Sequence, residues 1–293
     1  MKKSLITFVI IFSVFQVVYA ADWKSLHEKA DTLSLLQAQG AVTRSPDSFP
    51  ERYILGLVYL NMYNSDASYN TFLRLYTGFP GNFMAKWGLA ESLRRKHALD
   101  RSQELLEEII KDEPGFSPAY LSLGYVKYLK GDFESAVRLA LKVIEQDPGA
   151  VDLSNRVRAY CLYAGSKGLI AHYGGMLSKA INGTAVKHNL DKAEKLQPNS
   201  TQVLFGLGSY YLLAPVIAGG NKHKAEIYLK KAVVLEPRFA DVYVRLAQLY
   251  KIRKDSAKYK HYLKVALDLD PGNELALDTQ SNTCKFICTG GKE

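Results

Sequence analysis

The histidines, cysteines and glycine-rich segments of this 293-residue chain are the residues most able to hold a metal ion, attack a substrate or bind a cofactor. The six histidines are scattered, and none pairs with another at metal-ligand spacing. The segment Gly206-Leu207-Gly208 lacks a third glycine and follows no predicted strand, so it is no dinucleotide loop. We therefore expect no catalytic residue, no metal site and no cofactor, and we predict that the protein is not an enzyme.

The three cysteines do not define a disulfide framework. Cys284 and Cys288 lack the second cysteine pair or nearby histidine of a zinc site. In an oxidising compartment they could pair with each other across the last turn of a helix, or one could pair with Cys161 and leave an odd thiol. The sequence leaves these alternatives open.

The N-terminal segment is typical of a cleavable signal peptide. Lys2 and Lys3 precede an apolar run over residues 5–18, which is shorter than the ~20 residues that span a bilayer, and small Ala20 follows. An uncleaved membrane anchor is the alternative. No cysteine lies at position 20 or 21, so the lipid-bearing residue of a lipoprotein is missing. We expect a periplasmic or secreted protein that meets the membrane only through residues 1–20.

The charge of the mature chain does not favour nucleic acid as a partner. Without residues 1–20, the chain has 36 basic and 29 acidic residues and a formal charge of +7. The lysines and arginines are spread along the chain and mixed with acidic residues, and no run of five or more like charges occurs. We read this as an ordinary solvated surface.

Seven of the ten prolines follow one register. They are Pro46, Pro80, Pro114, Pro148, Pro198, Pro237 and Pro271. The first four have an equal spacing of 34, and the later spacings of 50 and 39 exceed it by 16 and 5, which indicates two insertions. Small residues recur 24 positions before a proline, at Gly56, Ala90 and Gly124, where two helices must approach closely. This period predicts repeated helix pairs.

The clearest unit, residues 119–148, resembles a tetratricopeptide repeat, and Asp132 is placed to cap its second helix. The resemblance implies an all-α fold, a right-handed superhelical solenoid of antiparallel helix pairs with about six repeats. The expected division of the single solenoid, residues 21–293, is a half repeat to 48, repeats over 49–82, 83–116, 117–150, 151–199, 200–238 and 239–272, and a capping helix over 273–293.

The two insertions fall in units 151–199 and 200–238. Helical spacing continues beyond the normal end of the first helix of unit 151–199, and Gly174-Gly175 and Asn182-Gly183 are expected to break it. In the next unit we expect the first helix to end near Leu213. The segments AYCLYAGSKG and APVIAGG are similar to exported T components of TRAP transporters, a resemblance that implies association with a periplasmic substrate-binding subunit.

The first helices of such a stack line its concave face, which predicts where a partner binds. Aromatic residues dominate this face, with one cationic stretch that could hold an acidic group of a peptide. The long helix of unit 151–199 could cover the same face. The predicted partner-binding residues are Tyr53, Trp87, Glu91, Arg94, Arg95, Tyr125, Tyr128, Tyr160, Tyr163, Lys167 and Phe205.

These patterns predict an exported, non-enzymatic scaffold that binds a protein or peptide partner through the concave face of the superhelix. The alternative is an accessory subunit of a periplasmic solute-uptake system, working with a substrate-binding protein. The sequence does not identify the partner or the oligomeric state.

Overall fold

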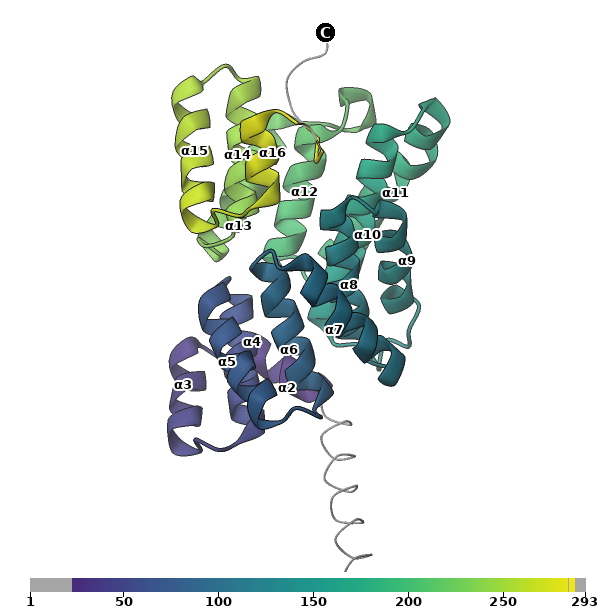
Figure 1. Cartoon of the computed structure of the whole chain (residues 1–293). Helices are drawn as coiled ribbons and strands as arrows, with labels where there is room; N and C mark the ends of the chain where they lie inside the picture. The colour runs from purple at the N-terminus through teal and green to yellow at the C-terminus, as the bar shows by residue number, and fades with distance from the viewer. Residues whose placement is uncertain (1–22, 284, 288–293) are drawn as a thin grey trace, which may run out of the picture.

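The computed structural model describes residues 23–283 and 285–287, and every regular element in these ranges is a helix (Figure 1). The helices are α2 (Trp23–Thr32), α3 (Leu35–Arg44), α4 (Phe49–Asn61), α5 (Ser65–Gly78), α6 (Phe83–Arg95), α7 (Leu99–Asp112), α8 (Ser117–Lys130), α9 (Phe133–Ile144), α10 (Leu153–Tyr173), α11 (Met176–Leu196), α12 (Thr201–Leu213), the 3₁₀ helix η1 (Val216–Ala218), α13 (Lys222–Leu235), α14 (Ala240–Ile252), α15 (Ser256–Leu269) and α16 (Glu274–Ser281). None of the described helices is both long and apolar enough to cross a bilayer.

Successive helices from α4 to α15 pack in pairs, which confirms the predicted all-α solenoid. The first helices of the pairs, α4, α6, α8, α10, α12 and α14, also contact one another in that order. We call the side of the stack that these helices line the inner face. Among the described helices, the main contacts of the second helices are with their neighbours in the chain, so they lie outside. In Figure 1 the pairs follow a curved path that brings the two ends of the stack near each other.

Short polar side chains begin many of these helices by capping free backbone N–H groups. Asp132 accepts from the backbone N–H of Ser135 at 3.0 Å, which confirms the predicted cap of α9. Asn82 does the same at α6, where its Oδ1 accepts from Met84 and Ala85. These caps help to fix where α6 and α9 begin and therefore which of their residues face the neighbouring helices.

The predicted small positions are sites of close helix contact. Phe72 of α5 is fully buried against Gly56 of α4, where an added Cβ would lie 2.5 Å from the phenyl ring. Ser102 of α7 is also fully buried and donates to the carbonyl oxygen of Ala90 on α6 at 2.7 Å. A larger side chain at either position would push the paired helices apart.

The first insertion lengthens both helices of its pair. Helices α10 and α11 have 21 residues each, compared with 13 in α6 and 14 in α7. Gly174-Gly175 separates α10 from α11 as expected, but the predicted break at Asn182-Gly183 is wrong. The Asn182 side chain donates to the carbonyl oxygen of Ser178 one turn earlier, so this residue is accommodated inside the helix. In the second insertion α12 ends at Leu213, as predicted.

The N-terminal helix α2 lies on the inner face. Residues 23–44, within the expected half repeat to residue 48, form two helices. Trp23 packs edge-on against Phe116, with ring centroids 5.2 Å apart, and His27 lies 5.1 Å from the ring of Trp87. Helix α2 therefore covers part of the inner face formed by α4 and α6, and it also contacts α10 across the stack.

The C-terminal segment also packs on the inner face. Asp278 of α16 accepts from the backbone N–H groups of Lys285 and Phe286 at 2.7 and 2.8 Å and so bends the chain back. Phe286 then stacks on Tyr128 of α8, with centroids 5.7 Å apart. The predicted signal peptide lies outside the described residues, as do Cys284 and Cys288, whose pairing the sequence left open. Burial raises the pKa of the Cys161 thiol to about 12.

Two side chains from the early repeats contact the last repeat and so join the two ends of the curved stack. Tyr63 stacks on Phe239 with centroids 4.5 Å apart, and His97 binds Asp270 at 2.8 Å and Glu274 at 2.9 Å. Both Tyr63 (φ 52°) and His97 (φ 63°) are left-handed, a conformation that costs a non-glycine residue about 1–2 kcal/mol. The equivalent turn one repeat after His97 has Gly131 (φ 89°). The early turns therefore have a side chain that contacts the last repeat, where a glycine would adopt the left-handed conformation at lower cost.

Replacing His97 with glutamine should destabilise the protein by about 1–2 kcal/mol near pH 6, because the imidazolium donates to two carboxylates. Hydrogen bonds to the carboxylates of Asp270 and Glu274 raise the pKa of His97 to about 10 from an ordinary 6.5. A raised pKa stabilises the fold fully below the ordinary value, and this stabilisation is lost as the pH rises through the folded value. The thermal unfolding midpoints of the natural protein and His97→Gln should therefore approach each other as the pH rises from 6.5 to about 10. Exposed His223→Gln is the control, and a pH-independent difference for His97→Gln would contradict the pairing.

Candidate functional site

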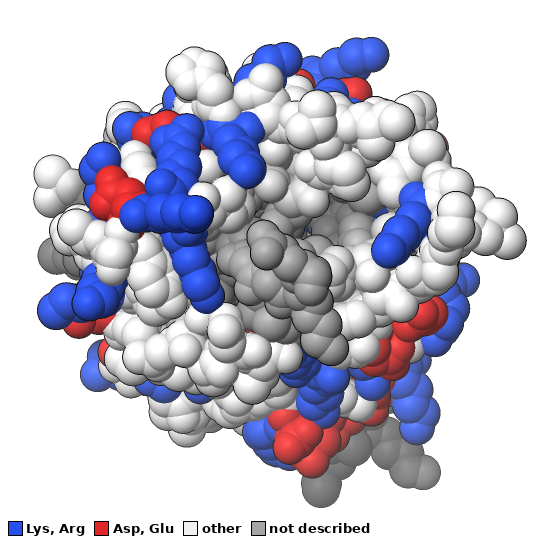
Figure 2. Space-filling model, turned by 90° about the horizontal axis from the view of Figure 1, so that it is seen from above, with Lys and Arg blue, Asp and Glu red and all other residues white. Residues whose placement is uncertain are grey.

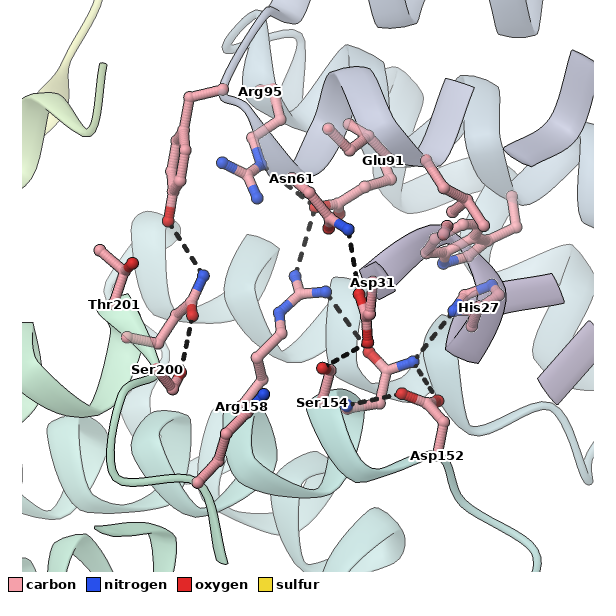
Figure 3. A pocket seen from close by; sticks show the side chains of 18 of the residues that line it. His27, Asp31, Asn61, Glu91, Arg95, Asp152, Ser154, Arg158, Ser200 and Thr201 are labelled. Atoms are coloured by element: carbon pink, nitrogen blue, oxygen red, sulfur yellow. Dashed lines mark hydrogen bonds and ion pairs between the residues drawn. The ribbon is translucent and has the colours of Figure 1, made fainter. Parts of the chain in front are cut away.

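A polar cavity of about 260 Å³ lies where α2, α4, α6 and α10 meet the segment 197–202 before and at the start of α12 (Figure 3). Its deep wall includes Trp87 and Glu91, while Asp31, Asn61 and Asn199 are exposed at its edge. The cavity is thus the part of the inner face between α2 and α12 that remains open beside the chain's own N-terminal helix.

Glu91 is the centre of the charged network in this cavity. The carboxylate is 1% exposed and accepts two bonds from Arg94, at 2.8 and 2.6 Å. Arg95 donates to it at 3.2 Å, and Arg158 approaches from α10 at 3.5 Å. Burial opposes ionisation of Glu91, but the three guanidinium groups together hold its pKa well below the usual range. One carboxylate is therefore surrounded by three permanent positive charges.

Tyrosine rings hold these guanidinium groups in place. Arg94 and Arg158 lie over the ring of Tyr125, 5.1 and 5.7 Å from its centroid. Arg95 lies 4.6 Å from the ring centroid of Tyr63, the residue that also stacks on Phe239 of the last repeat. Contacts of this kind orient a guanidinium while leaving its edge free to donate hydrogen bonds.

Arg158 has the weakest hydrogen bonds of the three arginines. Among the described residues its polar contacts are with Asn155 Oδ1 at 3.3 Å and Glu91 Oε1 at 3.5 Å. Figure 3 shows Arg158 and Glu91 pointing toward one another from helices on opposite sides of the cavity. The N–H groups of Arg158 are thus able to donate to a further acceptor.

The wall beside α2 contains the carboxyl groups of Asp31 and Asp152 and an uncharged histidine. Asp152 caps α10 and accepts from the backbone and side-chain nitrogens of Asn155 at 2.9 and 2.7 Å. The ring of His27 meets Asn155 at 3.3 Å and the Tyr53 hydroxyl at 2.9 Å. Burial lowers the pKa of His27 to about 3, so the imidazole is uncharged at neutral pH. This wall fixes α2 against α10 and adds no positive charge.

The opposite wall is the first turn of α12. Its N-cap residue Ser200 makes no side-chain bond to the backbone of that turn and donates instead to Gln202 Oε1 at 2.9 Å. Thr201 and Gln202 line the cavity with it. A helix start favours negative charge because its N–H groups are unpaired and its dipole is positive there.

Comparison with known families identifies the fold around this cavity. Residues 49–154 match the family described as the second ARM domain of tetratricopeptide repeat protein 21, and residues 240–273 match a tetratricopeptide repeat family. The chain is a tetratricopeptide repeat protein. No curated protein matches it. Proteins of this fold generally serve as scaffolds for protein–protein interactions rather than as enzymes.

Solved structures that are similar to this chain have low sequence identity to it. A tetratricopeptide repeat protein from Parabacteroides merdae is 12% identical, with a TM-score of 0.50 over 88% of this chain and 97% of that one. Pseudomonas aeruginosa PilF is 15% identical, with a TM-score of 0.45 over 79% and 96% of the two chains. YrrB, described as having an unusual peptide-binding site, is 16% identical, with a TM-score of 0.36 over 72% and 97%. At these identities the likeness concerns the fold alone.

The tetratricopeptide solenoid buries many of the residues predicted to bind a partner. Tyr53 and Trp87 are 0% and 2% exposed beneath α2, and Tyr128 lies beneath Phe286. Glu91 and Arg94 bind each other. These side chains hold the inner face together, and a direct role in partner binding stays a prediction for them.

The remaining predicted residues are divided between the cavity and the outer repeats. Arg95 lines the cavity, and Tyr125 lies beside it under Arg94. The others lie in units 151–199 and 200–238. Tyr160 lies under Lys192, Tyr163 under Lys167, and Phe205 against Phe239. The structure therefore brings only part of the predicted set together.

Several residues of the site were missed by the sequence reasoning, among them His27, Asp152, Asn155 and Arg158. The N-caps of α6 and α8, Asn82 and Phe116, are one repeat length apart, whereas Asp152, the N-cap of α10, comes two positions later than the same step predicts. This shift before α10 hides Arg158 from a search in the strict register of the earlier units. A helix-capping search starting at Asp152 could have recovered the shift.

Proposed function

We propose that this tetratricopeptide protein is an exported, non-enzymatic scaffold that binds a protein or peptide partner on its inner face, with an acidic group of the partner held by Arg95 and Arg158. Export is supported by the lysines, apolar run and small residue of segment 1–20. Binding of a partner is supported by the repeat family, whose members are generally scaffolds.

The single observation that supports binding of an acidic group is the number of positive charges that contact the one carboxylate of Glu91. Three guanidinium groups contact this one carboxylate, and only Arg94 donates two hydrogen bonds to it. A second carboxylate placed between Arg95 and Arg158 would accept charge-assisted hydrogen bonds from both. The uncapped first turn of α12 favours negative charge on the same side.

The volume of the cavity restricts what enters it. At about 260 Å³ it is smaller than the roughly 300–1,000 Å³ of sites for drug-sized ligands. One acidic side chain, or the carboxyl end of a peptide, fits this space, and the rest of the partner would lie over the exposed edge at Asn61 and Asn199.

Arg158→Gln tests the proposal on an array of peptides, each made with a free C-terminal carboxylate and with a C-terminal amide, and with Asp or Glu replaced by Asn or Gln. The natural protein should prefer the acidic forms, and the variant should bind them about tenfold or more weakly, because a charge-assisted hydrogen bond is worth about 1.5–3 kcal/mol. Arg156→Gln, on the same helix but outside the cavity, is the matched control.

Equal binding by Arg158→Gln and the control, or no preference for acidic peptides, would reject the proposed role of the cavity. A periplasmic substrate-binding subunit, the partner implied by the T-component resemblance, is one candidate protein to add to the assay. Its binding through Arg158 would support the transport role, and its failure to bind would leave the peptide result unaffected.

A further inference from the structure

The two insertions expose a group of apolar side chains far from the cavity. Of the seven large apolar residues that are at least 60% exposed in the described chain, five lie on the insertions. These are Met176 (89%), Leu177 (74%), Ile181 (60%), Val216 (87%) and Ile217 (100%). The other two, Leu36 and Val234, lie singly on α3 and α13. Grouped exposure of this kind marks an interaction surface, whereas single exposed residues are ordinary.

Both groups lie at the same end of the molecule. The turn that joins α10 to α11 and the loop that holds η1 are both at the top of Figure 1. Figure 2 looks down on this end, and most of its surface is uncharged, with Lys and Arg covering more of it than Asp and Glu. We call Met176, Leu177, Ile181, Val216 and Ile217, with the nearby Lys179, Lys222 and Lys224, the insertion tips.

The positive charge of the mature chain comes from the segment that contains these tips. Residues 153–225 contain nine Lys and Arg and only two acidic residues, Asp191 and Glu194. The rest of the chain after residue 20 has 27 basic and 27 acidic residues, so its formal charge is zero. Both acidic residues lie in the last two turns of α11, away from the turn where it begins. The insertion tips are therefore basic as well as apolar.

We propose that the insertion tips bind the surface of an anionic lipid bilayer. Side chains exposed on turns can enter the boundary between headgroups and acyl chains, and lysines beside them can meet lipid phosphates. A protein partner fits less well, because binding hot spots favour Trp, Tyr and Arg, and protein interfaces are depleted in Lys. The tips contain aliphatic side chains and lysines instead. This surface is separate from the cavity, so it does not depend on the proposed peptide binding.

Vesicle sedimentation tests this surface with the full chain. The protein should bind vesicles that contain phosphatidylglycerol and bind pure phosphatidylcholine vesicles on the order of a hundredfold more weakly, from about 1 kcal/mol for each of three lysines. Replacing Lys179, Lys222 and Lys224 with glutamine should remove this preference and its dependence on salt. Replacing the five apolar residues with serine should reduce binding to both kinds of vesicle by at least about tenfold.

The double variant Leu36→Ser with Val234→Ser is the matched control, since both residues are 79% exposed elsewhere. All variants keep residues 1–20, so binding through that segment would persist in every one of them. Unfolding curves verify that each variant is folded. Equal binding by the tip variants and the control would overturn the proposal, as would absence of binding by the natural protein. Binding of an acidic protein through these residues, without vesicle binding, would also overturn it.

Discussion

Replacing Glu91 with alanine is expected to lower the free energy of unfolding by about 3–5 kcal/mol, because the change leaves buried positive charge without its partner. Arg94 is 8% exposed and makes both of its short bonds to this carboxylate. Arg95 and Arg158 lose the same acceptor. Urea denaturation with the midpoint and slope fitted separately measures the loss.

Two control variants distinguish the buried network from ordinary ion pairing. Glu104→Ala removes an exposed pair with Arg101, in which both side chains are about 60% exposed, and should cost less than about 1 kcal/mol. Glu91→Gln keeps the shape and removes the charge. The pKa of Glu91 is held below its ordinary 4.5, so its contribution is complete above that pH and is lost as the pH falls through the lowered value. A difference between Glu91→Gln and the natural protein that does not shrink in acid would contradict this assignment.

Replacing Trp87 with alanine should also cost about 3–5 kcal/mol, because the removed indole would leave a cavity between α2, α4 and α8. The indole is 2% exposed, packs against the rings of His27 and Phe116, and donates from Nε1 to Ser122 Oγ at 3.1 Å. Trp87→Phe should cost less because it keeps part of the ring contact.

Leu36→Ala, at a side chain 79% exposed, should change stability by less than about 0.5 kcal/mol and provides the baseline. A loss of similar size for Trp87→Ala would show that α2 does not pack over this residue. The expected destabilisation also means that weaker partner binding by a Trp87 variant is not evidence of contact. Binding experiments should therefore use residues such as Arg158, whose side chain is partly exposed.

The repeat was predictable because its signals are local. Pro80 and Pro114 lie near the ends of units of equal length. Asp132 caps its helix by accepting from the backbone N–H of Ser135, only three residues ahead in the chain. The small residues at Gly56 and Ala90 mark helix crossings within single pairs. Each of these signals depends on neighbours within one repeat, so a period in the sequence is sufficient to find them.

The site could not be predicted in the same way because its contacts span the chain. Asn155 meets His27 across 128 residues, and Arg158 meets Glu91 across 67. The docking of α2 on the inner face depends on the curvature of the whole stack, which the repeat pattern leaves open. The positive excess in residues 153–225 is different, since it was visible in the sequence and was hidden only by averaging charge over the whole chain.

The contacts of Tyr63 and His97 have a consequence for how the protein folds and unfolds. An open array of repeats touches only nearest neighbours, so it can melt unit by unit from either end. Here His97 bonds to residues 173 and 177 positions away, which ties an early repeat to the last one. Such distant pairings are slow to form, because a long loop must close before they contribute. The closed array should therefore fold more slowly than an open one and resist unravelling from its ends.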